Sequence, residues 1–192
     1  MSVSYDEAWN LLHDWTASPS LLLHAKTVEA VMLRAAHQYG RGAADEQRWA
    51  ITGLLHDADY DRWPDEHPRH IVSWLEERGE PEIAHAISSH FTRWGVPAET
   101  PLDRALLACD ELTGFIVACC LVRPDGISTL SASSVKKKLK DRSFAAKVDR
   151  DEVRLGVEHL GVSLDDHIRF IIDAVSPHAN DFGLGPRPAR GS

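Results

Sequence analysis

The sequence predicts an all-helical bundle, and three observations lead to that prediction. Apolar residues recur three and four positions apart through most of the chain, which is the spacing of one face of an α-helix. Almost no segment alternates apolar and polar residues as a half-buried strand does. Capping residues, prolines and glycines separate the periodic segments at helix-length intervals. With 192 residues, 43% of them hydrophobic, the chain can bury one substantial core.

The first half of the chain predicts five helices. Ser4 to Glu7 form a capping box, which opens a helix. A second helix begins at Pro19 and is stopped by Gly40. Asp45 can cap a third helix that ends at the pair His56–Asp57. The five predicted ranges are about 5–15, 19–39, 45–57, 64–79 and 81–90.

The second half predicts one long helix and two shorter ones. The long helix covers about 101–122 and is followed by a turn at 123–126. A Ser-rich stretch and a basic run at 136–140 come next, and then two helical patterns near 150–160 and 165–175. Residues from 176 onward are rich in Pro, Gly and Arg, which is typical of a flexible tail. We therefore expect a single helical domain over 1–175 and a flexible tail over 176–192.

Charge and cysteine usage exclude several classes of protein. A net charge of -8 argues against general nucleic-acid binding, although a small phosphorylated substrate needs only a local basic patch. Cys109, Cys119 and Cys120 lie in apolar surroundings without CxxC spacing, as expected of reduced cytosolic thiols. No apolar run approaches the roughly 18 residues of a membrane span, and the N-terminus lacks a signal pattern. We expect a soluble cytoplasmic protein; nothing in the sequence predicts its oligomeric state.

Several polar residues stand on helix faces that should be buried. His24 precedes Val28 and Val31 on the apolar face of the second helix. Asp110 follows Leu106 and Leu107 on the apolar face of the long helix. Carboxylates in such positions are rarely left without a cation or several hydrogen-bond donors.

The stretch 51–70, ITGLLHDADYDRWPDEHPRH, adds an adjacent His56–Asp57 pair at the end of a buried helix. Helical spacing turns His67 and His90 inward, and it turns His70 and His85 toward water. Each histidine alone fits an ordinary core or surface position. Four inward histidines and two inward aspartates together predict a site for a divalent metal.

This ordered set resembles the HD-domain superfamily of metal-dependent phosphohydrolases. The signature H…HD…D is met by His24, His56–Asp57 and Asp110, and His67 and His90 match two further histidines that many members carry. The text EHPRHIVSWLEERG is similar to a helix of that family, and the resemblance covers roughly 21–121. It implies the HD-domain helical bundle, extended at its C-terminus by further helices.

Three further segments resemble an uncharacterised bacterial branch of predicted HD hydrolases. They are LLHDADYDRWPDEHP, DELTGFIVACCLVRP and SVKKKLKDRSFAA. Ala58-Asp59 follows the HD pair where Gly-Lys is common, and no Gly-Tyr-Pro follows His90. The second difference disfavours a cyclic-dinucleotide phosphodiesterase.

The resemblance implies the ligands, the cofactor and the substrate class. His24, His56, Asp57 and Asp110 would hold one divalent ion, and His67 and His90 would help to hold a second, with Asp57 as the bridge. Mixed nitrogen and oxygen ligands suit Mn, Fe, Co, Ni or Zn. The substrate would be a small phosphate ester, a nucleotide or a related phosphorylated metabolite.

Further residues carry two interpretations each. Besides Asp57, Asp59 or Asp61 could orient water or act as an outer base, or both could cap the loop, which we favour for Asp61. Lys136, Lys137 or Arg142 could grip a phosphate, or the basic run could be a solvated helix face. The side chains that could stack on a base or close the core are Trp63, Phe91 and Trp94, and Glu111 could contact substrate or face water.

Two other functions use the same residues. The HD-type di-iron oxygenases, similar to myo-inositol oxygenase, have the same kind of ligand set and cleave C–C or C–P bonds with dioxygen. A metal-stabilised helical signalling module would bind the metal without turnover. The complete ligand set favours catalysis, and iron loading with oxygen consumption would separate the oxygenase from the hydrolase.

Overall fold

The computed structural model describes residues 3–187, and over that range it is built from α-helices, short 3-10 helices and turns, with no strand. This confirms the predicted all-helical class. In chain order the helices are α1 (Tyr5–Trp15), α2 (Pro19–Tyr39), α3 (Glu46–Leu55), α4 (Arg69–Glu77), α5 (Pro81–His90), α6 (Pro101–Leu121), α7 (Ala132–Leu139), α8 (Arg150–Leu160) and α9 (Leu164–Val175).

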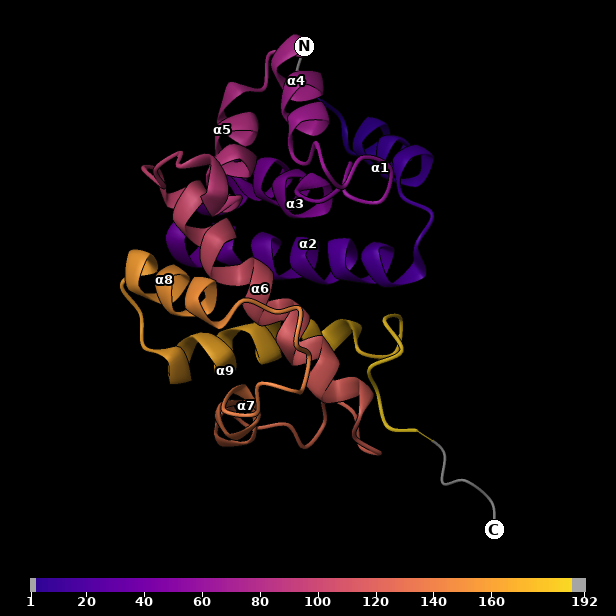
Figure 1. Ribbon diagram of the computed structural model, residues 1–192, viewed down its shortest axis with the longest axis vertical. Helices are drawn as coiled ribbons and strands as arrows, with labels where there is room; N and C mark the ends of the chain where they lie inside the picture. Colours follow the sequence, from indigo (N-terminus) through magenta and orange to yellow (C-terminus); the bar gives the residue numbers. More distant parts are fainter. Residues whose placement is uncertain (1–2, 188–192) are drawn as a thin grey trace.

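Two long helices, α2 and α6, cross near the middle of the molecule (Figure 1). Helices α1, α3, α4 and α5 lie on one side of this crossing, and α7, α8 and α9 lie on the other. Helix α3 packs against α2 where Gly53 would place an added Cβ only 2.9 Å from the Glu29 backbone. Helix α8 approaches α6 in the same way, since a Cβ on Gly156 would lie 2.6 Å from the Ala108 Cα. Glycine permits both close contacts.

Most predicted helix boundaries are confirmed, and the fourth is wrong. Ser4 and Glu7 form the predicted capping box at α1, and α2 and α5 occupy 19–39 and 81–90. Helix α4 begins at Arg69, not near residue 64, and residues 56–68 form turns instead. Proline lacks the N–H needed inside a helix and disfavours helical geometry at the preceding residue. Pro68 therefore keeps His67 out of the helix.

Residues 176–187, expected to begin a flexible tail, pack on the helices instead. Leu184 is only 1% exposed, and its carbonyl accepts a hydrogen bond from Ile127 N at 2.9 Å. Arg187 N donates to Pro124 O at 2.9 Å. These contacts hold the segment against the turn that follows α6, and composition did not reveal them. The rest of the expected tail, residues 188–192, lies outside the described residues.

Among the described helices, none combines the length and the apolar character needed to cross a membrane.

Candidate metal centre

Five separate segments bring six polar side chains to one point of the core. His24 lies in the second turn of α2, and Asp110 lies midway along α6. The pair His56–Asp57 follows the last residue of α3, and His90 is the last residue of α5. His67 comes from the loop before α4. The predicted ligand set thus brings together residues up to 86 positions apart in the sequence, from His24 to Asp110, as only the folded bundle allows.

The first group of ligand atoms belongs to His24, His56 and Asp110. The Nε2 atoms of the two histidines lie 3.1 Å apart, and Asp110 Oδ1 lies 2.9 Å and 3.2 Å from them. Ligands bonded to one ion at about 2.1 Å lie roughly 3.0 Å apart at right angles and about 3.4 Å apart at tetrahedral angles. The three donor atoms therefore have the spacing of a metal site.

A second group contains His67 and His90, and Asp57 lies between the two groups. Asp57 Oδ1 is 3.4 Å from His67 Nε2 and 3.7 Å from His90 Nε2. Its other oxygen, Oδ2, is 3.5 Å from His56 Nε2 and 3.8 Å from His24 Nε2. Each triad, His24–His56–Asp57 and Asp57–His67–His90, has its donor atoms within 4.8 Å of one another. One carboxylate thus faces both groups.

Three of the histidines are oriented by a second hydrogen bond. The Nδ1 of His56 bonds to Gly53 O at 2.8 Å, and the Nδ1 of His90 bonds to Ile87 O. A carbonyl can only accept, so in both rings the proton is on Nδ1. When the ring is neutral, Nε2 then carries a lone pair that points at the centre. This second bond is the usual support of a metal-binding histidine.

Asp59 gives the same support to His67. Its Oδ1 lies 2.7 Å from His67 Nδ1, and its Oδ2 accepts from the backbone N–H of His70 and Ile71 at 3.0 Å and 3.1 Å. Asp59 is fully buried, and it does not line the cavity described below. It therefore caps the start of α4 and orients His67. Asp61 accepts from the N–H groups of Ala17 and Ser18, which is the capping role we favoured for it.

The field at the centre favours positive charge. Burial by itself lowers the pKa of His56, but the carboxylates of Asp57 and Asp110 outweigh it and raise that pKa to about 9. Burial raises the pKa of Asp57 and Asp110, yet the His56 imidazole and the other histidines hold both carboxyl pKa values well below their usual range. Both aspartates are therefore ionised at neutral pH. At neutral pH without a metal, a proton on His56 supplies the positive charge that the carboxylates favour. A divalent cation would replace that proton, because two carboxylates and deprotonated imidazoles are a suitable donor set for it.

A cavity of about 620 Å³ opens onto these groups. Its floor contains His24, Asp57, His67, His90 and Asp110. The walls and mouth are formed by Tyr60, Pro64, Phe91, Thr92, Arg93, Glu111, Gly114, Lys147, Val148, Asp149 and Glu152. Burial and then the charge of Asp110 raise the pKa of Glu111 to about 8, and its carboxyl accepts from Asp149 N at 3.0 Å. The mouth thus carries two cations beside several acidic groups.

The basic run does not reach this cavity. Lys136 pairs with Asp165 of α9, Lys137 lines a different cavity, and Arg142 is not among the lining residues. Arg93 and Lys147 supply the positive charge at the mouth instead. Sequence reasoning missed both, and it also missed Tyr60, which is 45% exposed. Their only sequence signal is their position in the loops next to His90 and α8 and beside Asp57.

Of the aromatic candidates, only Phe91 lines the cavity. Trp63 stacks on His70 with ring centroids 4.2 Å apart and meets Trp15 edge-on at 5.1 Å. Trp94 packs beside Phe91, under the guanidinium of Arg69. These two tryptophans pack outside the cavity lining, so Tyr60 and Phe91 are the aromatic faces that a ligand would meet.

Residues 21–114 match the HD domain family. The chain carries an HD domain and so belongs to the HD-domain superfamily. The match begins just before His24 and ends just after Asp110, so it contains all six side chains of the centre. Helices α7, α8 and α9 lie beyond it. Among curated proteins and solved structures, none matches this chain.

Proposed function

We propose that this HD-domain protein is a metal-dependent phosphohydrolase that acts on a small phosphate ester, with a nucleotide as the favoured substrate. One observation carries the proposal most directly. Asp57 turns one carboxylate oxygen to His24 and His56 and the other to His67 and His90. A single carboxylate shared between two histidine pairs is suited to two neighbouring divalent ions.

The residues of the centre divide into those that would bind metal and those that orient the metal-binding histidines. His24, His56 and Asp110 would hold one divalent ion, His67 and His90 would help to hold a second, and Asp57 would be shared between the two groups. When bound, divalent ions acidify a water and neutralise charge on phosphate oxygens. Asp59 does not touch the substrate and keeps Nε2 of His67 directed at the centre. The Gly53 and Ile87 carbonyls do the same for His56 and His90.

The mouth of the cavity supports a phosphorylated substrate with an aromatic body. Arg93 and Lys147 are the cations there, and we assign the phosphate contacts to them and not to Lys136, Lys137 or Arg142. Tyr60 and Phe91 offer aromatic faces against which a nucleobase can stack. The volume of about 620 Å³ is within the usual range for small-ligand sites.

The test is phosphate release from a panel of nucleotides and sugar phosphates by metal-stripped protein reloaded anaerobically with Mn²⁺, Co²⁺ or Fe²⁺. We expect release that depends on the added metal, and we expect Asp57→Ala to retain below about one per cent of it, because both ligand groups lose a member. Metal content measured on the same samples shows whether loading falls with activity.

Leu33→Ala is the matched control, since Leu33 is an exposed residue of α2 away from the centre. It should keep both metal content and turnover. Full activity in Asp57→Ala would contradict the proposal. Iron retained with oxygen uptake and no phosphate release would replace it with the oxygenase chemistry.

A further inference from the structure

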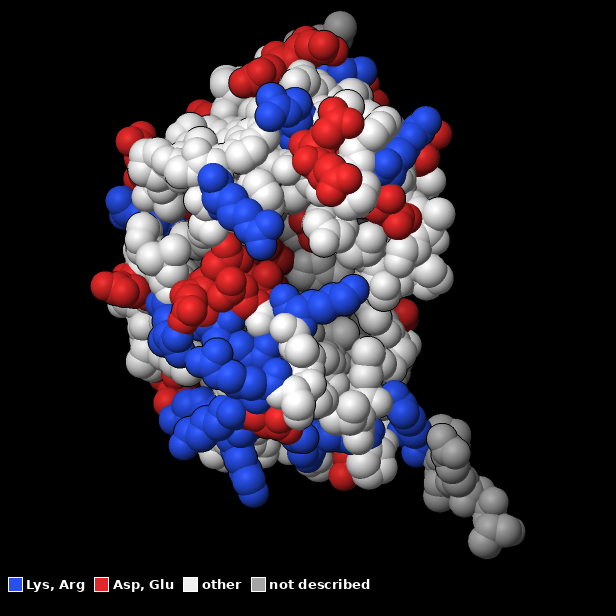
Figure 2. All heavy atoms as spheres, in the orientation of Figure 1, with Lys and Arg blue, Asp and Glu red and all other residues white. Residues whose placement is uncertain are grey.

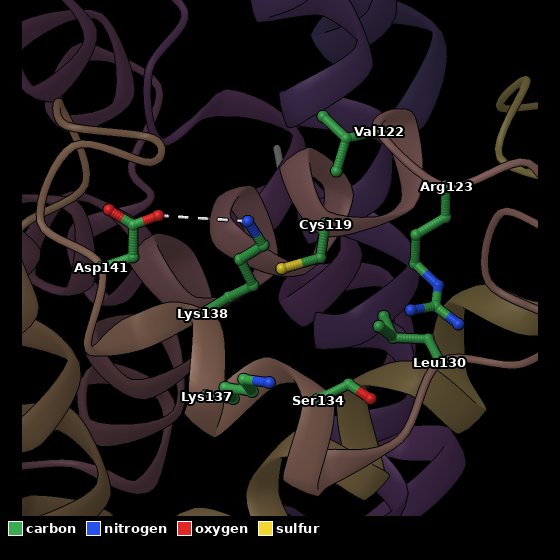
Figure 3. Close-up of a pocket in the computed structure, with 8 residues that line it drawn as sticks. All are labelled: Cys119, Val122, Arg123, Leu130, Ser134, Lys137, Lys138 and Asp141. Carbon is green, nitrogen blue, oxygen red and sulfur yellow. Dashed lines mark ion pairs between the residues drawn. The ribbon is translucent and has the colours of Figure 1, made fainter.

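A second cavity, of about 470 Å³, lies between the end of α6 and α7, beyond the part of the chain that matches the HD domain (Figure 3). Its lining comes from α6 and the residues after it (Cys119, Val122, Arg123), from Leu130, from α7 (Ser134, Lys137, Lys138) and from Asp141. None of these residues lines the metal cavity. The second cavity is therefore a separate feature of the C-terminal extension.

The polar side of this cavity is basic. Arg123, Lys137 and Lys138 face a single carboxylate, Asp141, so the lining has an excess of positive charge. Figure 2 shows Lys and Arg gathered over this lower part of one face, below a cluster of acidic side chains. Lys138 Nζ stands 4.0 Å from Asp141 Oδ2, which is a loose ion pair (Figure 3). Lys137 has no ion-pair or hydrogen-bond partner among residues 3–187.

Within the part of the chain that the structure describes, the Arg123 guanidinium is held by hydrogen bonds and still has a free N–H donor. Its Nη2 donates to the carbonyl and the hydroxyl of Thr129 at 3.1 Å and 2.7 Å. Its Nε is buried and lacks a hydrogen-bond partner within the described residues. A buried donor without a partner is costly, and an oxyanion would satisfy it. Arg123 is thus oriented before any ligand arrives.

The other side of the cavity is apolar. Cys119 and Leu130 are buried, whereas Val122 is 61% exposed beside the opening. An exposed valine next to buried apolar walls gives a ligand a surface to cover. The lining contains no histidine, and burial raises the pKa of the Cys119 thiol to about 11, which leaves it unreactive. The cavity is equipped to bind and not to catalyse.

We propose that this cavity is a binding site for a small molecule that carries a phosphate-like oxyanion on an apolar body. Arg123, Lys137 and Lys138 hold the oxyanion together with the Ser134 hydroxyl, and Val122 and Leu130 contact the apolar part. The three cations suit a dianion better than a monoanion, and the guanidinium fork suits its oxygens. Asp141 opposes binding, because its carboxylate competes for Lys138.

The site adjoins the metal centre through one short segment, residues 141–149. Asp141 borders the basic cavity, and Lys147, Val148 and Asp149 border the metal cavity. The Arg150 guanidinium donates to the carbonyls of Asp141, Phe144, Ala145 and Val148, which ties the segment together. Lys138 also lies over the Phe144 ring, 4.7 Å from its centroid. A ligand that takes Lys138 therefore acts on Asp141 and Phe144, at the end of this segment that borders the basic cavity.

The experiment is calorimetric titration of the full-length, metal-free protein with phenylphosphonate, which has a dianionic head, an apolar ring and no ester to hydrolyse. We expect saturable binding at one site. Lys137→Gln and Arg123→Gln should each weaken it about tenfold, since each removes one charge-assisted hydrogen bond. Asp141→Asn should tighten it. Methylphosphonate and benzoate should bind more weakly, because the first lacks the apolar ring and the second carries a single charge.

Lys140→Gln is the matched control, because it removes the same charge from the same basic run outside the lining. Its affinity should change less than twofold. Equal losses in Lys140→Gln and Lys137→Gln would show a diffuse surface field and overturn the proposal. A loss in Lys147→Gln alone would place the probe in the metal cavity and also overturn it, as would no saturable binding. Because no turnover is measured, these outcomes are independent of the proposed hydrolase activity.

Discussion

Two nearby residues of α6, Ala108 and Asp110, each contact a buried histidine, and the pKa values of the two histidines shift in opposite directions. Asp110 lies 3.2 Å from His56, whose pKa rises to about 9, while the Ala108 carbonyl accepts a hydrogen bond at 3.0 Å from His167, whose pKa burial lowers to about 4. Both imidazoles are completely buried. The difference lies in the partners, since His56 meets carboxylates and His167 meets a carbonyl, the Cys109 sulfur and the Phe170 ring.

The comparison separates burial from function. Burial alone disfavours a charged imidazole, and only nearby carboxylates create a place where a cation is stable. A histidine on the inner face of a helix is therefore a ligand candidate only when a carboxylate shares its pocket. His56 and His167 both face inward, but only His56 belongs to a potential metal site among the described residues.

The largest effect is expected from removing the Asp59 carboxylate, which supports His67 at the metal centre. Asp59→Ala would leave His67 Nδ1 and two N–H groups at the start of α4 without their acceptor. We expect unfolding free energy to fall by about 3 kcal/mol and metal affinity at the His67–His90 group to fall about 10–100-fold. Urea unfolding and Mn²⁺ titration measure the two losses separately.

Asp61→Ala is the control for that variant. Asp61 belongs to the same loop and also accepts from two backbone N–H groups, but it is exposed and does not contact His67. It should lose about 1 kcal/mol of stability with unchanged metal affinity. If Asp59→Ala binds Mn²⁺ as tightly as Asp61→Ala does, Asp59 serves the fold alone.

This contrast also shows what the sequence could and could not predict. Helix ends with local causes, such as the Ser4 capping box or Pro81 at the start of α5, were predictable because their determinants lie within a few residues. Helical spacing likewise identified His24, Asp110 and His90 as inward-facing. Five of the six proposed ligands are accessible to periodicity because each is on a helix or lies within two residues of a helix end, whereas His67 is in a loop.

Other features depend on contacts between distant segments. His67 faces the centre because Asp59 and the turn at Pro68 hold it, not because it continues the face of α4. The basic run lies away from the metal cavity because α7 packs on α9, where Lys136 meets Asp165. Arg93 and Lys147 are loop cations whose position only the packed bundle decides. Helical spacing predicted the inward direction of His67 correctly, but from a helix that does not include it, and it contains no information on the other placements.

The pH dependence of stability tests whether burial lowers the pKa of His167. The pKa of His167 is about 4 in the folded protein against 6.5 in a reference peptide, so the unfolded chain takes up a proton first as pH falls. Stability from this group is complete above about pH 6.5 and is lost between there and about pH 4. At pH 5 the loss amounts to about 2 kcal/mol relative to pH 7.5.

His167→Gln removes this titration and keeps an amide that can donate to the Ala108 carbonyl. Urea unfolding of both proteins at pH 7.5 and pH 5 gives the double difference, which cancels the other ten histidines of the chain's eleven. We expect the variant to lose about 2 kcal/mol less than the wild type on acidification. Equal losses in both proteins would mean that His167 is protonated in the fold, and the contrast with His56 would disappear.

The smallest effect is expected at the mouth of the metal cavity, where neither burial nor a fixed partner dominates. Lys147 is exposed, so its charge is screened and its side chain is free to move. Lys147→Gln should raise KM for a phosphorylated substrate about three- to tenfold and leave kcat nearly unchanged, since it acts on binding and not on the centre. Arg142→Gln, a like change on the same segment but outside the lining, should leave both constants unaltered. A KM that rises in Arg142→Gln and not in Lys147→Gln would assign the phosphate contact to Arg142 and not to Lys147. The residues that line the metal cavity would then not be the ones that bind the phosphate.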